Sequence, residues 1–120
     1  MNIGKTGAEG EKRVANFLRK NGFSIIKRNY VCRYGEVDII AEDGQYILFV
    51  EVKTRKNGSM VSGVEAVDAY KQKRITLTAN DYIVKTGCQK QPRFDIAEVT
   101  TFIKADNTTG YKLHYIENVW

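Results

Sequence analysis

Apolar side chains first recur at helical spacing near the start of the chain. Val14, Ala15 and Leu18 fall on one face of a helix. Gly22 follows at a position where a glycine commonly ends a helix, because glycine tolerates the left-handed backbone of a C-cap. The pattern therefore predicts an α-helix over residues 6–21.

Three segments rich in β-branched and aromatic residues follow and predict three strands. They read "FSIIKRNYVCRY", "GEVDIIA" and "YILFVEVKTR", and the "AEDGQ" between the last two carries the Asp-Gly signal of a hairpin. In the second and third segments both alternating faces carry apolar residues, which is typical of strands covered on both sides. We therefore expect a sheet with helices against it.

A second helix is predicted over residues 67–85, with Asp68 as its N-cap and Gly87 near its end. Its predicted inward-facing side chains are Ile75, Ala79, Tyr82 and Ile83. Residues 56–63, which read "KNGSMVSG", are rich in glycine and serine and predict a mobile loop before the helix.

The chain closes with two further predicted strands, "RFDIAEVTTFI" and "YKLHYIENV". The predicted order is αβββαββ, and the helix between the third and fourth strands can return the chain for a parallel pairing. This order predicts an α/β fold with a mixed sheet flanked by helices. A length of 120 residues is typical of one domain, so we expect a single domain over residues 1–120.

The overall composition favours a globular protein with polyanionic partners. A formal net charge of +5 attracts nucleic acid through counterion release. The start "MNIGKTGAEGEKR" lacks the apolar stretch of a signal peptide, and the chain has no run long enough to cross a membrane, so we expect a cytoplasmic protein. Cys32 and Cys88 stand alone and are expected to be reduced thiols rather than zinc ligands.

Four charged residues interrupt the most apolar part of the sequence, namely Glu36, Asp38, Glu51 and Lys53. A hairpin loop of two or four residues at the Asp-Gly turn would place Glu36 opposite Glu51 and Asp38 opposite Phe49. All four charges would then share one face, with Asp38 and Glu51 as diagonal neighbours roughly 7 Å apart at the backbone. A three-residue loop would instead put these two acids on opposite faces.

Two carboxylates held this close repel each other unless a cation lies between them. Oxygen ligands suit Mg²⁺ or Mn²⁺, and two carboxylates with waters and a substrate phosphate form a common magnesium arrangement. Lys53 could then face the same phosphate or the attacking water. The alternative is a cross-strand ladder of ion pairs without a metal.

Glu11 lies on the inward-facing stripe of the first predicted helix, where it could reach a shared cation or a buried base. Alternatively, it is a partly exposed residue favoured by the helix dipole. At the start of the second helix, Lys71, Gln72 and Lys73 are either a solvated face or contacts to a substrate backbone. Asp95 is expected to pair with Arg93 or to cap a strand end.

The spacing of Asp38, twelve further residues and Glu51-Val52-Lys53 resembles the D…ExK signature of the PD-(D/E)xK nuclease superfamily. The superfamily's leading Pro-Asp is here Val37-Asp38. In order, the blocks "GAEGEKRVANFLRKNGF", "RNYVCRYGEVDIIAEDG", "FVEVKTR", "EAVDAYKQKRI" and "RFDIAEV" resemble the YraN family of predicted bacterial endonucleases. The layout is also similar to that of archaeal Holliday-junction resolvases.

This resemblance implies a restriction-endonuclease-like αβββαβ core and a metal-dependent nuclease acting on DNA, including branched or structured DNA. The implied catalytic residues are Glu11, Asp38, Glu51, Lys53 and Gln72. The implied ligands of Mg²⁺ or Mn²⁺ are Asp38, Glu51 and the Val52 carbonyl, with Glu11 holding a second ion or a bound water. The implied nucleic-acid contacts are Arg55, Lys56, Lys71, Lys73 and Arg74.

Several alternatives stay open at this stage. A non-catalytic nucleic-acid-binding module could keep the same fold, with the acids as structural ion pairs. DNA is expected ahead of RNA as the partner, but no motif separates them, and the sequence leaves open a homodimer.

Overall fold

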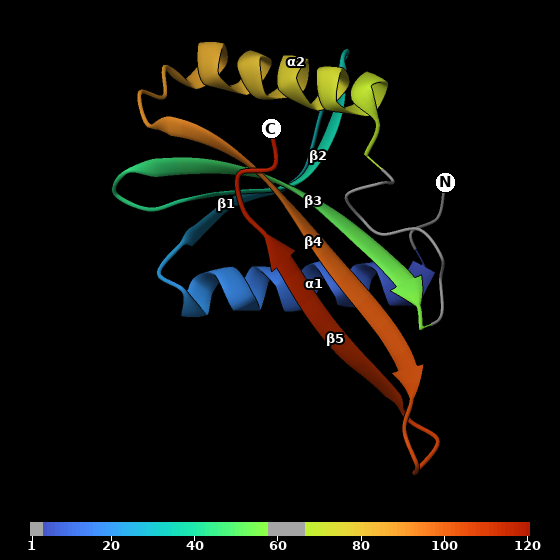
Figure 1. The fold of residues 1–120 in the computed structure, drawn as a ribbon. Helices are drawn as coiled ribbons and strands as arrows, with labels where there is room; N and C mark the ends of the chain where they lie inside the picture. The colour runs from blue at the N-terminus through green and yellow to red at the C-terminus, as the bar shows by residue number, and fades with distance from the viewer. Residues whose placement is uncertain (1–3, 58–66) are drawn as a thin grey trace.

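Within residues 4–57 and 67–120, which the computed structural model describes, the chain forms two helices and five strands in the order αβββαββ (Figure 1). The elements are α1 (Gly4–Lys20), β1 (Ser24–Cys32), β2 (Gly35–Glu42), β3 (Tyr46–Lys56), α2 (Ala69–Thr86), β4 (Gln91–Ile103) and β5 (Thr109–Ile116). This order is the predicted one. Of the loop predicted at 56–63, residues 58–63 lie outside the described residues, while Lys56 ends β3.

The predicted caps explain where the helices begin and end. The Asp68 side chain accepts a hydrogen bond of 2.9 Å from the Lys71 backbone N–H, which satisfies a donor in the first turn of α2. Gly87 ends α2 in the left-handed conformation, with φ of 68°, and its N–H donates to the Ile83 carbonyl. Gly22, with φ of 90°, follows α1 in the same way. Both predicted helix ends are therefore confirmed.

The strands form one sheet in the order β1-β2-β3-β4-β5. Only the β3–β4 pair is parallel, and the other three neighbouring pairs are antiparallel. The parallel pair follows from the connection through α2, because a crossover is needed to bring a strand back in the same direction. The predicted mixed sheet is confirmed.

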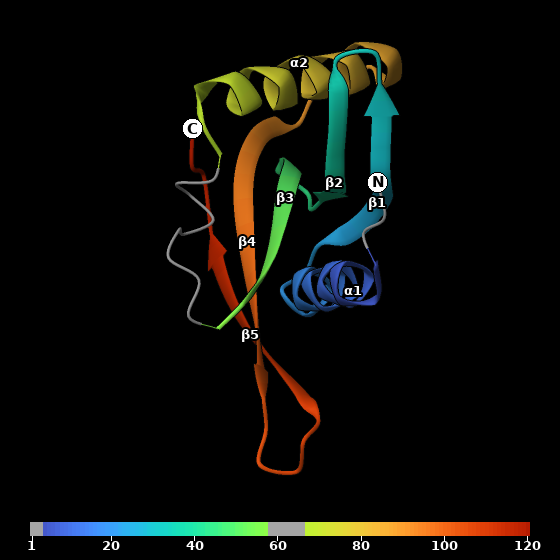
Figure 2. The same ribbon diagram turned by 90° about the vertical axis from the view of Figure 1, so that its right-hand side faces the viewer.

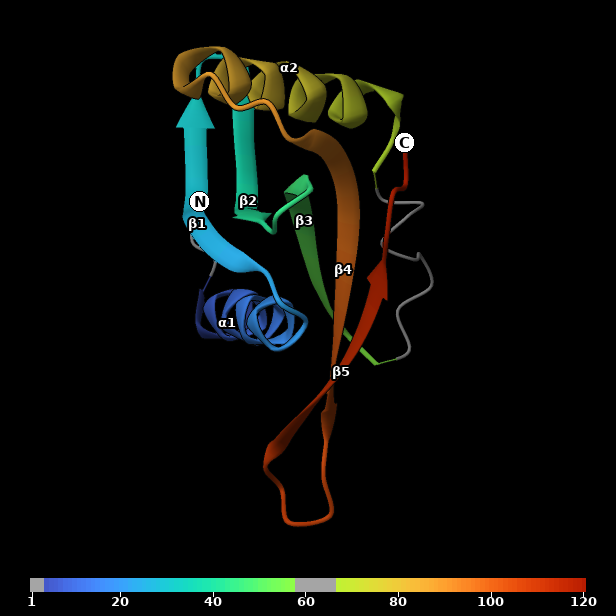
Figure 3. The ribbon, with the colours of Figure 1, turned by 90° about the vertical axis from the view of Figure 1, so that its left-hand side faces the viewer.

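The two helices cover opposite faces of this sheet (Figures 2 and 3). Side chains alternate along β3, so Leu48 and Val50 join the core under α1, whereas Ile47 and Phe49 join the core under α2. From α1 the buried apolar side chains are Val14, Ala15 and Leu18, and from α2 they are Ile75, Ala79 and Tyr82. The apolar patterns of the helices and strands were therefore correct indicators of burial.

Neither described helix is long and apolar enough to cross a membrane.

The register between β2 and β3 differs from the predicted one by two residues. Ile40, not Asp38, lies opposite Phe49, and the last pair before the strands separate is Ile39 with Val50. The reason is the turn: the Asp43 carboxylate accepts hydrogen bonds of 2.8 and 2.7 Å from the N–H groups of Gln45 and Tyr46. Asp43 therefore opens the turn instead of occupying its tip. A shift by two residues keeps every side chain on its predicted face.

Candidate active site

Asp38 and Glu51 meet where β2 and β3 separate. The two strands are paired only over Ile39–Glu42 and Ile47–Val50, and beyond that point they run apart (Figure 2). Asp38 is the residue just before the last pair and Glu51 the residue just after it. Counting on from the Ile39–Val50 pair, Asp38 and Glu51 are the next facing positions, whereas the prediction made them diagonal neighbours.

The fork also leaves backbone groups of β3 available to side chains. The Val52 N–H donates a hydrogen bond of 2.8 Å to Asp38 Oδ2 instead of to a backbone carbonyl of β2. In a strand the N–H and C=O of one residue point to the same side, so the Val52 carbonyl is directed to the same edge. Two acidic side chains and one backbone carbonyl thus face the opening between the strands.

Asp38 is held in an environment that disfavours its ionised form. Burial, and after it the charge of the neighbouring Glu51, raise the pKa of Asp38 from 3.8 to about 7, and the hydrogen bond from Val52 only partly opposes this. The negative charge of Glu11 acts in the same direction. A carboxyl with such a pKa sits where a cation would restore its negative charge.

Two lysines already approach the buried Glu51 carboxylate, of which 7% is exposed. Lys71 Nζ of α2 lies 2.6 Å and Lys53 Nζ lies 3.3 Å from Glu51 Oε2. Burial and the nearby Lys71 ammonium lower the pKa of Lys53. For Lys71, burial lowers the pKa, but the hydrogen bonds with Glu51 and Lys53 and the charges of Glu51 and Asp38 together outweigh burial and raise it. Lys71 thus serves as the principal counter-charge of Glu51, and Lys53 is the more readily deprotonated lysine.

Glu11 approaches the site from the opposite helix. Its side chain is buried, and Oε1 accepts hydrogen bonds from Arg28 at 3.4 Å and Asn29 at 3.3 Å. Gly10 permits this approach, since a Cβ on it would overlap the Thr54 hydroxyl of β3. The inward orientation predicted for Glu11 is confirmed, and its partner is a base on β1. The alternative of a partly exposed residue was wrong.

The donor set at the fork fits Mg²⁺ or Mn²⁺. These ions prefer oxygen ligands and are usually bound by one or two carboxylates with waters and substrate phosphates, not by a complete protein cage. Asp38, Glu51 and the Val52 carbonyl supply such a partial set, and burial together with the neighbouring Glu51 charge raises the pKa of Asp38. In the described part of the chain no cluster of three His, Cys, Asp or Glu side chains is arranged for a metal.

Of the other predicted site residues, Gln72, Lys73 and Arg74 lie on α2 near Lys71, whereas Glu36 does not face Glu51. Gln72 donates a hydrogen bond of 3.1 Å to the Val67 carbonyl at the start of α2. Lys73 and Arg74 are exposed on the same helix. Glu36 shares the predicted side of β2 but faces α2 residues instead of Glu51, because the register is shifted.

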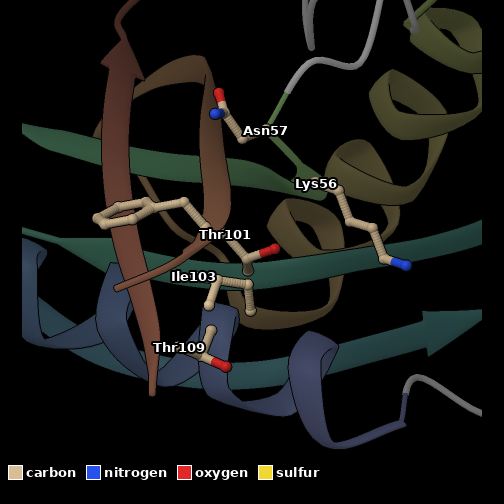
Figure 4. A pocket seen from close by; sticks show the side chains of 6 residues that line it. Lys56, Asn57, Thr101, Ile103 and Thr109 are labelled. Atoms are coloured by element: carbon tan, nitrogen blue, oxygen red, sulfur yellow. The ribbon is translucent and has the colours of Figure 1, made fainter. Parts of the chain in front are cut away.

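Lys56 borders a separate pocket of 460 Å³ at the far ends of β3 and β4 (Figure 4). The other lining residues are Asn57, Thr101, Phe102, Ile103 and Thr109. None of them belongs to the acid pair. The neighbouring Arg55 lies between this pocket and Lys53 in the strand, and its buried Nε lacks a hydrogen-bond partner among the described residues.

Asp95 has a structural role, as expected from its place in "RFD". Its fully buried carboxylate accepts hydrogen bonds from Arg93, the Tyr115 hydroxyl and the Asn118 N–H.

Tyr70 is the residue at the site that the sequence patterns did not single out. It lies one residue before Lys71, and the only sequence signal was its spacing of four from Arg74, which places both on one side of a helix.

Comparison with known proteins identifies the family. Residues 10–99 match the family described as "Uncharacterised protein family UPF0102", and the chain belongs to this family. A UPF0102 protein of Caldanaerobacter subterraneus subsp. tengcongensis is 40% identical over 121 residues, covering 100% of this chain and 98% of the relative. One from Symbiobacterium thermophilum is 44% identical, covering 79% and 81%. One from Alkaliphilus metalliredigens is 41% identical, covering 95% and 96%. The YraN-like family expected from the sequence blocks is thereby confirmed.

Proposed function

We propose that this protein is a metal-dependent nuclease of the PD-(D/E)xK superfamily that hydrolyses phosphodiester bonds of DNA in the cytoplasm. The observation that carries the proposal is the pairing of Asp38 with Glu51 at the fork between β2 and β3. A buried acid pair is costly to maintain, and such a cost is typically retained at functional sites. The five-stranded mixed sheet with two helices is compatible with a restriction-endonuclease-like core.

In this proposal Asp38, Glu51 and the Val52 carbonyl hold Mg²⁺ or Mn²⁺, with Glu11 acting through a water or a second ion. When bound, the cation lowers the pKa of a water nucleophile and offsets charge that develops on the phosphate. Lys53 orients that water or stabilises the transition state. Its lowered pKa, caused first by burial, suits a group that exchanges a proton near the reacting atoms.

The substrate backbone would run along the start of α2. Lys71, Lys73 and Arg74 lie in that turn and the next, and contacts from these cations to phosphates give salt-dependent binding with little base readout. Arg55 and Lys56 would extend the contact along the end of β3. Gln72 would act as a polar residue that holds the helix start in place through the Val67 carbonyl.

One observation favours a second function, a nucleic-acid-binding module without catalysis. The ion pairs from Lys71 and Lys53 to Glu51 are what a purely structural role for the acids would require. Within the described residues both of these ion pairs go to Glu51 and none goes to Asp38, whose pKa stays raised. This supports a site for a further positive charge beside Asp38.

The test is cleavage of fluorescently labelled duplexes, flaps and four-way junctions in Mg²⁺ or Mn²⁺. Asp38→Asn and Lys53→Ala are each expected to reduce the cleavage rate at least about a hundredfold, because each removes a group placed at the reacting atoms. Lys90→Ala is the matched control, since Lys90 pairs with Glu42 at the other end of β2. Cleavage that survives both active-site substitutions would disprove the assignment. Intact DNA binding without cleavage by the wild type would favour the module.

A further inference from the structure

A cavity of 380 Å³ lies between the tip of the β1–β2 hairpin and the first two turns of α2. Gly35 and Ile75 form part of its wall. Gly35 has φ of 147°, a backbone conformation that favours glycine, and the hairpin tip at Gly35 lies beside Thr78 and Arg74 of α2. The volume falls in the range of small-molecule sites. The hairpin and helix thus border an open pocket with room for a group about the size of one nucleotide.

One residue, Lys71, connects this cavity to the acid pair. Lys71 lines the cavity, and its ammonium group lies 2.6 Å from Glu51 Oε2. A ligand in the cavity would therefore sit beside the proposed scissile phosphate. The cavity is part of the described site, but neither the acid pair nor Lys53 lines it.

Tyr70 gives the cavity an aromatic wall. Its side chain is 70% exposed, so one face of a large ring is open to a ligand. Arg74 holds the ring in place: its Cζ lies 5.7 Å from the ring centroid, and its Nη1 donates a hydrogen bond of 3.4 Å to the Tyr70 hydroxyl. An exposed ring fixed by an arginine is a suitable platform for a nucleobase.

The charges around the cavity favour a nucleotide over a bare anion. Lys71 and Arg74 supply the cations that a phosphate needs. Glu36 and Asp68 also line the cavity, and their carboxylates would repel a phosphate placed deep inside it. A carboxylate does accept hydrogen bonds from base amino groups. Asp68 Oδ1 already accepts the Lys71 N–H at the cap of α2, so Glu36, which has no such capping role, is the acceptor we assign to the base.

We propose that this cavity binds one unpaired nucleotide of the substrate, with its base against Tyr70 and its phosphate toward Lys71 and Arg74. The inference rests on the proposed nuclease function and specifies its substrate class as DNA with unpaired nucleotides beside the cleaved bond. A base in a continuous duplex is stacked on its neighbours and cannot enter such a cavity without being extruded.

The experiment compares two flap substrates that differ at one position. One carries cytosine and the other an abasic site at the first unpaired nucleotide, so their backbone charge is the same. Affinity is measured by fluorescence anisotropy in Ca²⁺, and cleavage is measured separately in Mg²⁺. Wild type is expected to bind the cytosine flap about five- to 150-fold more tightly, because base stacking on an aromatic side chain contributes about 1–3 kcal/mol.

The variants test whether Tyr70 is responsible. Tyr70→Ala is expected to bring the affinity ratio to within about twofold of one, whereas Tyr70→Phe, which keeps the ring, retains most of the preference. Circular dichroism checks that both variants fold. A wild-type ratio near one, or a ratio unchanged in Tyr70→Ala, would overturn the inference.

The cleavage arm separates this inference from the proposed function. Asp38-dependent cleavage at equal rates on blunt duplex and flap would overturn the inference and leave the nuclease proposal standing. Base-dependent binding that is lost in Tyr70→Ala, without Asp38-dependent cleavage of any substrate, would support the nucleotide cavity and reject the nuclease.

Discussion

Asp38→Asn is expected to stabilise the protein in the absence of divalent metal while abolishing its activity. Asp38 is largely buried beside Glu51, and burial followed by the Glu51 charge raises its pKa from 3.8 to about 7. A carboxyl whose folded-state pKa lies above its unfolded value destabilises the fold when it is ionised. Asparagine removes the charge, and its side-chain oxygen can still accept the hydrogen bond from the Val52 N–H.

The magnitude follows from the size of the shift. Below about pH 4 Asp38 is protonated in both states and costs little, and the cost grows as pH rises through the interval from 3.8 to about 7. A rise of about three pKa units corresponds to a cost of about 4 kcal/mol, and this full cost applies at pH values above that interval. The amide group of asparagine must find a new acceptor, so we expect a gain of about 2–4 kcal/mol at pH 8 and below about 1 kcal/mol at pH 4.

The assay is urea denaturation of wild type and Asp38→Asn in EDTA at pH 8 and at pH 4. Asp106→Asn makes the same chemical change in an exposed turn, where the Thr108 hydroxyl and N–H lower the pKa of the acid, and it should give no gain at either pH. Mg²⁺ at a hundred times its dissociation constant should add about 2.7 kcal/mol to wild type alone. An Asp38→Asn variant that is no more stable than wild type at pH 8 would refute the reasoning.

Three further predictions concern the parts of the molecule that hold the site in place. Tyr115→Phe removes a hydrogen bond to the buried Asp95 and should cost about 1–3 kcal/mol by urea denaturation, whereas Tyr111→Phe, whose ring contacts Arg13, should change stability little. Asp68→Ala removes the N-cap of α2 and should cost about 1 kcal/mol in thermal unfolding, and recovery of most of this in Asp68→Asn would confirm the capping role. Lys73→Gln and Arg74→Gln should each lower the slope of log affinity against log salt by about one in DNA titrations, and an equal change in Lys85→Gln, at the far end of α2, would contradict this binding surface.

Much of the fold could be predicted because local signals and tertiary packing agree. Asp68 and Gly87 were recognisable as caps of α2 because each satisfies backbone groups within its own turn. The register of β2 and β3 was not predictable to the residue. Asp43-Gly44 is a typical turn tip, but the Asp43 side chain also binds the N–H groups of Gln45 and Tyr46, and this moves the tip by one residue.

The candidate site was predictable in its residues and less so in its contacts. Acids inside an apolar strand segment indicate chemistry, so Asp38 and Glu51 were identified correctly as neighbours. The fork at which they face each other depends on where pairing stops, which no local pattern encodes. Tyr70 was missed because an aromatic residue at a helix start has no distinct meaning until the hairpin tip at Gly35 is seen beside it.

Calorimetric titration with Mn²⁺ measures whether Asp38 and Glu51 bind a divalent cation. We expect measurable binding to wild type, loss of that binding in both Asp38→Asn and Glu51→Gln, and unchanged binding in Glu42→Gln, whose carboxylate pairs with Lys90 away from the fork. Absence of heat with wild type, or heat that persists in both active-site variants, would show that these two acids do not form a cation site.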